Sequence, residues 1–215
     1  MDMTRPLSGA PLFAALTIVA CARAPVGTGA PPLSPAAAAR ADSGRPAYSA
    51  ADVHFMSGMI GHHAQAVLIA GWAPSHGASL PVRALCERIV VGQRDEIAFM
   101  QSWLQDRHLP VPDGDPSHVL MPGMQHAMMP GMLTPEQLAR LDQARGPDFD
   151  RLFLSFMIQH HQGAITMVEQ LMGSQGAAQD DKVFKFVSDV SADQTTEIDF
   201  MSKMLEALPP AAPSP

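Results

Sequence analysis

Two short segments of this sequence carry the same pattern of potential metal ligands. The segment MIGHHAQA begins at Met59, and the segment MIQHHQGA begins 98 residues later, at Met157. In each segment a methionine is followed, three and four residues further on, by two adjacent histidines. Thioether sulfur and neutral imidazole nitrogen together suit borderline and soft metal ions, and thioethers select Cu(I) over Mg²⁺, Ca²⁺ or Mn²⁺. The pattern therefore indicates a site for a soft metal ion.

The spacing determines where these side chains would lie on a helix. Residues three or four positions apart share a helix face, so Met59 would lie beside both His62 and His63. Adjacent residues point about 100° apart around the axis, so one histidine of each pair should face the seam of a helical bundle and the other its flank or solvent. The second segment has the same geometry. The candidate ligands of the two segments are Met59, His62, His63, Met157, His160 and His161.

The alternative interpretation is that such residues only fill the core. A single methionine at a core position usually packs, and a lone buried histidine is usually a satisfied core residue. Repetition at equivalent places favours metal binding, because packing alone does not require two bulky polar rings side by side. For the other helical methionines packing is the preferred interpretation. This packing set is Met56, Met100, Met172, Met201 and Met204, of which Met56, Met100 and Met201 stay as secondary ligand candidates.

A methionine-rich segment, MPGMQHAMMPGM, runs from Met121 to Met132. Its Pro-Gly pairs exclude a regular helical stripe, so core packing explains these methionines less well. Two interpretations stay open here: a further metal site, or a loop that covers the end of a bundle with flexible apolar side chains. The additional candidates are Met121, Met124, His126, Met128, Met129 and Met132.

Several other polar or sulfur-bearing residues have simpler expectations. Cys86 should be a small buried hydrophobe rather than a ligand. Glu96 and Glu197, each one turn before a methionine, could orient the imidazoles or could be surface acids. The histidines expected to be solvated or to cap helices are His54, His76, His108 and His118.

Breaks in the hydrophobic pattern divide the chain into helices. Ser49 and Asp52 form a capping-box pattern at the start of the first helix, and Pro81 suits the start of the second. Residues 108–146 form a crossover rich in methionine and proline, with one short helix in it. The predicted helices cover about residues 49–73, 81–107, 134–144, 147–172 and 180–208.

The second pair of long helices repeats the first. Besides the two Met-His segments, the run QRDEIAFMQSWL from Gln93 corresponds to QTTEIDFMSKML from Gln194. Each pair forms an amphipathic hairpin with an apolar stripe, and two such hairpins bury their stripes most simply against each other. The sequence therefore predicts an all-α fold, a four-helix bundle built from two repeated helical hairpins.

Composition restricts the function classes. The chain of 215 residues is 47% hydrophobic, enough for one sizeable core, and contains 15 methionines and 9 histidines. Its net charge of -7 argues against nucleic-acid binding, because phosphate recognition needs clustered Lys and Arg. No nucleophile with an aligned base, phosphate-binding glycine loop or nucleotide motif is evident, so no enzymatic reaction is predicted.

The N-terminus has the features of an export signal. An apolar stretch over residues 7–20 follows Arg5 and is too short to span a membrane. Its last three residues and Cys21 form the segment IVAC, which resembles a bacterial lipoprotein cleavage box; Cys21 would then carry a lipid, the only membrane contact. The alternatives are a signal peptide cut elsewhere or a chance cysteine. The predicted units are a lipoprotein-type signal peptide (1–21), a disordered tether rich in Pro and Ala (22–48), the bundle (49–208) and a tail (209–215).

Together these patterns resemble the domain-of-unknown-function family 305 (DUF305) over about residues 50–208. The matching segments are DVHFMSGMIGHHAQAV, the Q-x-x-E-I-x-x-M-x-x-W-L run from Gln93, MPGMLTPEQLARL and FDRLFLSFMIQHHQGAITM. The resemblance implies an exported bacterial protein with a ferritin-like four-helix bundle. It also implies periplasmic binding of copper or silver by Met and His side chains, a role that carries over to the six residues above and to Met167.

Two positions depart from the family pattern. Ile69 stands where the family often has methionine, as Met167 does in the second hairpin, and Met204 replaces the second tryptophan. The two half-sites are therefore expected to differ in affinity.

The leading hypothesis is a copper-binding lipoprotein or periplasmic metallochaperone. It would hold Cu(I), and also Ag(I), for sequestration, resistance or delivery to copper-handling envelope proteins. One alternative is a di-iron or di-manganese enzyme, but the Glu-x-x-His motif of such centres is missing and only Glu96, Glu169 and Glu197 offer carboxylates near the seam. Another is a metal-free envelope adaptor whose histidines bind a partner or sense pH.

Overall fold

The computed structural model describes residues 47–117 and 129–209 of the chain. Within these residues the structure is helical and has no strand, so the predicted all-α fold is confirmed. The helices are α2 (Ala50–Gly71), α3 (Leu80–Asp106), α4 (Pro135–Gln143), α5 (Pro147–Met172) and α6 (Asp181–Ala207). The predictions for the signal peptide, Cys21, His118, Met121, Met124, His126 and Met128, and for most of the tether and tail, lie outside the described residues.

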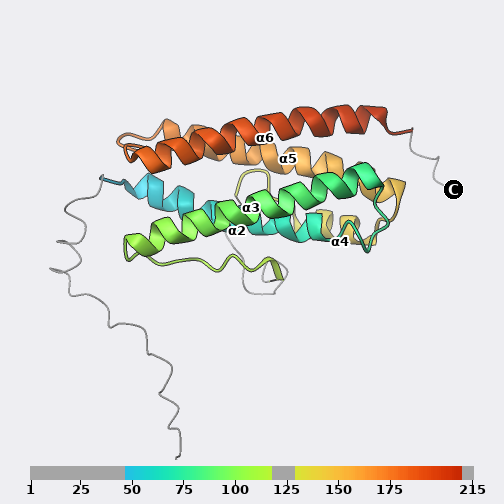
Figure 1. Ribbon diagram of the computed structural model, residues 1–215, viewed down its shortest axis with the longest axis horizontal. Helices are drawn as coiled ribbons and strands as arrows, with labels where there is room; N and C mark the ends of the chain where they lie inside the picture. Colours follow the sequence, from blue (N-terminus) through green and yellow to red (C-terminus); the bar gives the residue numbers. More distant parts are fainter. Residues whose placement is uncertain (1–46, 118–128, 210–215) are drawn as a thin grey trace, which may run out of the picture.

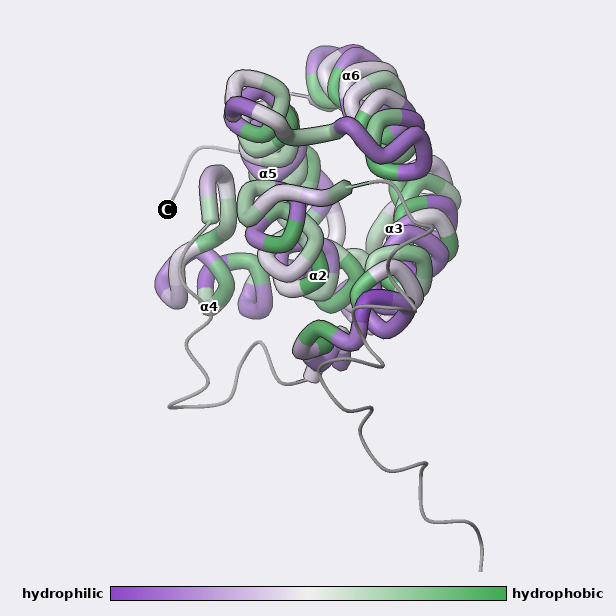
Figure 2. The backbone as a smooth tube through the Cα atoms, turned by 90° about the vertical axis from the view of Figure 1, so that its left-hand side faces the viewer, coloured by the Kyte–Doolittle hydropathy of each residue, from purple (hydrophilic) through white to green (hydrophobic). Residues whose placement is uncertain are grey.

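Four long helices form the bundle as two antiparallel hairpins, α2 with α3 and α5 with α6 (Figure 1). The hairpins meet along α2 and α5, which run in opposite directions. A view along the helices shows these four around a common centre, with α4 outside the bundle (Figure 2). Because α3 and α5 run in the same direction, the chain between them returns along the bundle, as in ferritin-like folds with one long crossover.

Local signals explain where the helices begin. The Ser49 hydroxyl accepts the N–H of Asp52 at 3.2 Å, and Asp52 Oδ2 accepts the N–H of Ser49 at 2.7 Å, which completes the predicted capping box of α2. Thr134 and Gln137 form the same arrangement at α4. Proline stands in the first turn of α3 and of α5, where its missing N–H costs nothing.

We call α2 and α5, which meet where the hairpins join, the inner helices, and α3 and α6 the outer helices. The two kinds differ in how many of their residues are buried. The inner helix α2 buries 14 of its 22 residues, whereas the outer helix α6 buries 6 of its 27. An outer helix needs only an apolar stripe, while α2 is covered on almost every side. Even so, no helix in the described part of the chain is both long and apolar enough to cross a membrane.

The hydrophobic core is divided into two halves, one toward each end of the bundle. The first half contains Phe55 and Met59 of α2 with residues 164–171 of α5. The second contains Ile69 of α2 with residues 149–157 of α5. The division falls near the middle of the helices, where polar side chains replace apolar ones.

Two buried aspartates at equivalent places tie the hairpins together. Asp52 Oδ1 on α2 accepts the backbone N–H of Ala178, in the loop between α5 and α6, at 2.8 Å. Asp150 on α5 accepts the N–H of Ser79, in the loop between α2 and α3, at 3.2 Å. Each hairpin thus caps the loop of the other, a reciprocal contact that follows from the two-fold arrangement of the repeat.

Candidate metal centre

The four paired histidines lie at the middle of the bundle. His62 and His63 occupy the centre of α2, His160 and His161 occupy the centre of α5, and all four are fully buried. One histidine of each pair contacts the opposite inner helix, and the other contacts the outer helix of its own hairpin. The alternative that one histidine of each pair points into solvent is therefore wrong, because the outer helices cover that flank. We refer to these residues as the histidine layer.

His62 and His160 meet across the seam between α2 and α5. Their ring centroids are 3.8 Å apart, with 38° between the planes. His160 Nε2 donates to the backbone carbonyl of His62 at 3.0 Å, and His62 Nε2 donates to the carbonyl of Pro130 in the crossover at 2.9 Å. A carbonyl oxygen can only accept, so both Nε2 atoms carry the proton.

His63 and His161 face the outer helices, where each meets a glutamate. His161 Nε2 donates to Glu197 Oε2 at 2.6 Å. His63 Nε2 lies 2.7 Å from Glu96 Oε2, but the carboxylate lies off the N–H direction, so this contact is electrostatic rather than an aligned hydrogen bond. Of the two interpretations of these glutamates, the contacts support the one in which they orient the imidazoles.

The second ring nitrogen of each histidine has no partner. All four Nδ1 atoms are buried and lack a hydrogen bond within the described part of the chain. Buried polar atoms without a partner are uncommon in folded proteins. When Nε2 carries the proton, Nδ1 of a neutral imidazole keeps its lone pair, which is the form in which histidine binds metals. The histidine layer therefore holds four potential nitrogen donors.

Burial keeps the central rings neutral. It lowers the pKa of His62 from 6.5 to about 3, with a further contribution from the neighbouring His63. Burial, followed by the proximity of His62, also lowers the pKa of His160 well below its ordinary value. At neutral pH a proton therefore does not compete with a metal ion for the lone pairs of these two rings.

The methionine candidates are buried on both sides of the histidine layer. Met59 lies in the first half of the core and Met157 in the second, so the two Met-His segments flank the layer from opposite ends. Burial of this kind is compatible with packing and with ligation. Met56, Met59, Met100, Met157 and Met201 are fully buried, and Met167 is 6% exposed.

The structure bears on the expectations for Met172 and for Ile69, which stands where the family often has methionine. Met172 does not pack in the core as expected: it is 47% exposed at the end of α5. Ile69 is fully buried in the half of the core opposite Met167, so the two hairpins differ in their sulfur content at these equivalent positions.

Sequence reasoning missed two members of the central layer. Gln93 on α3 and Gln194 on α6 are 3% and 2% exposed and stand at the centres of the outer helices. Both side-chain polar atoms of Gln93 and the Oε1 atom of Gln194 lack partners in the described residues. The signal was present, since each is a polar residue on an apolar stripe and recurs in both hairpins.

The end of the crossover packs against the inner helices through two residues that the sequence did not single out. Gln65 Oε1 accepts the N–H of Leu133 at 2.7 Å, and Gln65 Nε2 donates to the Leu133 carbonyl at 3.1 Å. Gly163 lets the crossover backbone approach α5, because a Cβ there would lie 1.9 Å from the Pro130 oxygen. These contacts bring the Pro130 carbonyl to His62.

The same contacts place two crossover methionines over α2. Met132 is 7% exposed and Met129 is partly buried. Together with His54 and His62 they line a pocket of about 200 Å³, which we call the crossover pocket. These are the two candidates of the methionine-rich segment that fall within the described residues, and both lie next to a paired histidine.

The remaining candidates have structural explanations. His76 is buried rather than solvated, at 5% exposure, and its Nε2 lies 3.0 Å from the Asp142 carbonyl in the last turn of α4, which is the helix-capping role among the two expected for it. His54 and His108 are exposed as expected. Burial raises the pKa of the Cys86 thiol to about 12, as suits a small buried hydrophobe. Glu169 is exposed, so it does not offer a carboxylate at the seam.

The chemistry of the central donors fits a soft ion better than a hard one. Imidazole nitrogen with thioether sulfur nearby is a donor set for Cu(I), whereas Mg²⁺ or Ca²⁺ requires oxygen. In residues 47–117 and 129–209, no three His, Cys, Asp or Glu side chains are grouped so that they could hold one metal ion by themselves. A metal site in this part of the chain therefore also needs methionine sulfur.

The sequence profile described as Domain of unknown function (DUF305) matches residues 52–205, which is most of the chain. The chain belongs to the DUF305 family. The matched range of this DUF305 protein includes both hairpins, the crossover and the whole histidine layer. Among curated proteins no match is found.

Solved structures of DUF305 proteins resemble the bundle. A DUF305 fragment from Deinococcus radiodurans is 27% identical with a TM-score of 0.63, over 76% of this chain and 100% of that chain. A DUF305 protein from Streptomyces coelicolor is 26% identical with a TM-score of 0.60, over 73% and 92%. CopM in its Cu(I)-bound form is 26% identical with a TM-score of 0.55, over 72% and 95%. CopM has also been solved in Cu(II)-bound and Ag-bound forms.

Proposed function

We propose that this DUF305 protein is an exported copper-binding protein that holds Cu(I), and also Ag(I), for sequestration, resistance or delivery. The observation that carries the proposal is the set of four buried Nδ1 atoms without a partner in the described residues. A structural histidine normally uses both ring nitrogens or exposes one of them. Here every paired histidine keeps one nitrogen for a ligand.

The contacts of the Nε2 atoms prepare the Nδ1 atoms to bind a metal ion. His62, His160 and His161 donate their Nε2 protons to oxygens, which fixes the tautomer and raises the basicity of Nδ1. Met59 and Met157 are buried one turn before the histidines and are the thioether donors of the proposed site, with Met167 as a further one. Copper and silver binding by CopM supports the same cargo for this chain.

The proposed action is ligand exchange, without bond chemistry on a substrate. A site with several weak donors lets a partner's ligand enter while the ion still holds another, so a copper-handling envelope protein could accept the cargo. The proposed location is the periplasm or cell envelope, with a lipid on Cys21 as anchor. Thioether ligands suit an oxidising compartment, since they are not lost to disulfide formation.

Competition for Cu(I) against a chromophoric chelator, without oxygen, tests this function. The wild type should withdraw Cu(I) from the chelator. Joint replacement of His62→Gln and His160→Gln should weaken Cu(I) binding by at least the ~10–100-fold typical of losing a residue that only orients a ligand. His108→Gln, a change of the same type at an exposed position after α3, should bind as the wild type does.

A second pair of variants guards against loss of folding in the histidine double variant. Met59→Leu with Met157→Leu keeps the core volume and removes the sulfur, so the bundle should stay folded while its preference for Cu(I) falls. The proposal fails if the wild type leaves all Cu(I) with the chelator, or if both double variants bind as tightly as the wild type.

A further inference from the structure

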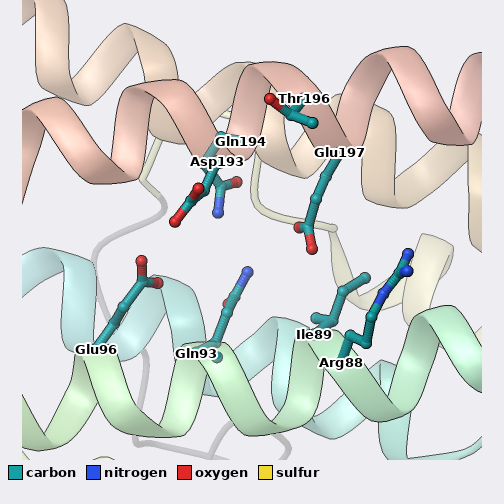
Figure 3. A pocket seen from close by; sticks show the side chains of 9 residues that line it. Arg88, Ile89, Gln93, Glu96, Asp193, Gln194, Thr196 and Glu197 are labelled. Atoms are coloured by element: carbon teal, nitrogen blue, oxygen red, sulfur yellow. The ribbon is translucent and has the colours of Figure 1, made fainter.

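A pocket with polar side chains lies between the outer helices α3 and α6 (Figure 3). Its volume is about 150 Å³, and we call it the α3–α6 pocket. Figure 3 shows that side chains from both helices extend into the gap between them. The charged and amide residues of its lining are Arg88, Gln93 and Glu96 from α3, and Asp193, Gln194 and Glu197 from α6.

The charge of the α3–α6 pocket favours a cation. Glu96, Asp193 and Glu197 contribute three carboxylates, and the guanidinium of Arg88 lies 5.1 Å from the Phe200 ring centroid, stacked on that ring. These three carboxylates lie around one pocket, so their negative charges repel one another. A cation between them would relieve that repulsion.

The buried side-chain amides of Gln93 and Gln194 also indicate a bound ligand. Gln93 and Gln194 are almost completely buried and have unpartnered polar atoms, and both extend into this pocket (Figure 3). A buried amide without a protein partner needs water or a bound ion. Amide and carboxylate oxygens are ligands for cations that keep part of their hydration shell, and a pocket of about 150 Å³ has room for such waters.

The α3–α6 pocket is connected to the proposed metal site by its own glutamates. Glu197 Oε2 lies 2.6 Å from His161 Nε2, and Glu96 Oε2 lies 2.7 Å from His63 Nε2. An ion held by these carboxylates is therefore adjacent to two of the four imidazoles. The crossover pocket on the other side, beside His62, is lined by histidine, methionine and small residues, without a carboxylate among its described residues.

We propose that the α3–α6 pocket is the admission site for the cargo ion. It attracts a hydrated metal cation, contacts the cation briefly through single carboxylate or amide oxygens while the cation keeps most of its waters, and passes it to the histidine layer. The step exchanges water and oxygen ligands for nitrogen and sulfur, with no change in oxidation state. This inference rests on the proposed function, since it assigns the route to the same site.

Stopped-flow loading with Ag(I), a redox-inert ion, tests the role of the pocket charge. Asp193→Asn removes one carboxylate that does not touch a histidine, so the association rate should fall about threefold at low salt and less at high salt. Asp199→Asn removes the same charge from an exposed position of α6 outside the pocket and should load like the wild type. Equilibrium affinity should be the same in all three proteins.

Joint replacement of Gln93→Leu and Gln194→Leu tests the amides. It replaces orphan polar groups with apolar ones of similar size, so the fold should be as stable as the wild type or more so. Association and dissociation should both slow by a similar factor, on the order of 10-fold, because an admission site acts on the barrier and not on the bound state. Ser57→Phe fills the crossover pocket and should leave loading unchanged.

The outcomes separate the two proposals. Failure of the wild type to bind Ag(I) at equilibrium overturns the proposed function. Normal wild-type binding with unchanged rates in the Asp193→Asn protein and in the double glutamine variant overturns the admission site alone. Slow loading of the Ser57→Phe protein with normal loading of the pocket variants assigns the route to the crossover pocket instead.

Discussion

At the residue scale, the main feature is a buried layer of polar side chains in which certain nitrogen and oxygen atoms lack hydrogen-bond partners in the described residues. Four imidazole Nδ1 atoms and the amides of Gln93 and Gln194 contribute to it. Each unsatisfied group costs roughly 1–3 kcal/mol of folding free energy. A protein selected only for stability would fill these positions with apolar residues, so the layer points to a ligand.

Acid should destabilise the bundle through its central histidines. An unfolded chain protonates His62 near pH 6.5, whereas in the folded protein its pKa is about 3. Between these values the unfolded state binds more protons, so the free energy of unfolding falls by up to ~1.4 kcal/mol for each unit that the pH falls. His160 shifts in the same direction and adds to the loss.

Thermal melts followed by circular dichroism at pH 7, 6 and 5 check this expectation. The midpoint should fall with pH in the wild type and in His54→Gln, which changes an exposed histidine. His62→Gln should flatten the dependence, because it removes one of the buried groups. A midpoint that does not change between pH 7 and pH 5 would contradict the assignment of neutral buried rings.

At the element scale, the crossover completes the site that the helices begin. α2 and α5 supply the histidines, but the carbonyl that orients His62 comes from Pro130. The crossover reaches that position because Gly163 has no side chain to hold it away from α5. A helix-interior glycine is unfavourable by ~1 kcal/mol relative to alanine, so this one has a packing reason.

Gly163→Ala should therefore destabilise the protein although alanine favours helices. The new Cβ would lie 1.9 Å from the oxygen of Pro130. This oxygen belongs to the backbone, so it cannot rotate away as a flexible side chain would. The crossover must shift, at a cost of ~1–3 kcal/mol, and the His62–Pro130 hydrogen bond should weaken. Gly92→Ala is the matched control, because nothing lies within 4 Å of its Cβ, and it should stabilise by ~0.5–1 kcal/mol. Urea unfolding of both variants decides the sign.

At the scale of the whole molecule, the repeat produces reciprocal contacts between the hairpins. Asp52 and Asp150 occupy equivalent positions, and each accepts the backbone N–H of a loop in the other hairpin. Both carboxylates are almost completely buried. The two halves of the bundle are thus held by the same contact made twice, in addition to the packing of α2 on α5.

Asp150→Ala should lower the free energy of unfolding by more than the removal of another acidic residue from the same helix turn. The substitution leaves the N–H of Ser79 without its acceptor, which should lower the free energy of unfolding by ~1–3 kcal/mol. Asp148→Ala removes an exposed acid from the same first turn and should cost at most ~1 kcal/mol, through the helix dipole alone. Equal losses in chemical denaturation would show that Asp150 does not link the hairpins.

Local information was enough to predict the elements of this fold. Capping residues and prolines lie next to the helix termini that they specify, so the helix ends were predicted to within about two residues. The spacing of apolar residues is likewise a property of one helix. The repeat then placed the paired histidines at equivalent positions of two hairpins, and the structure brings all four to the middle of the bundle, with His62 and His160 in contact at the seam. Their role as metal ligands stays a prediction.

Only the tertiary structure decided which atoms of those residues are free. The Pro130 carbonyl, Glu96 and Glu197 use the Nε2 side of the rings, and these partners lie far along the chain or on another helix. The burial of His76 and the exposure of Met172 also depend on which element covers them. Helical periodicity specifies the direction of a side chain from its own axis. It does not specify what stands opposite, because that depends on how separate elements pack.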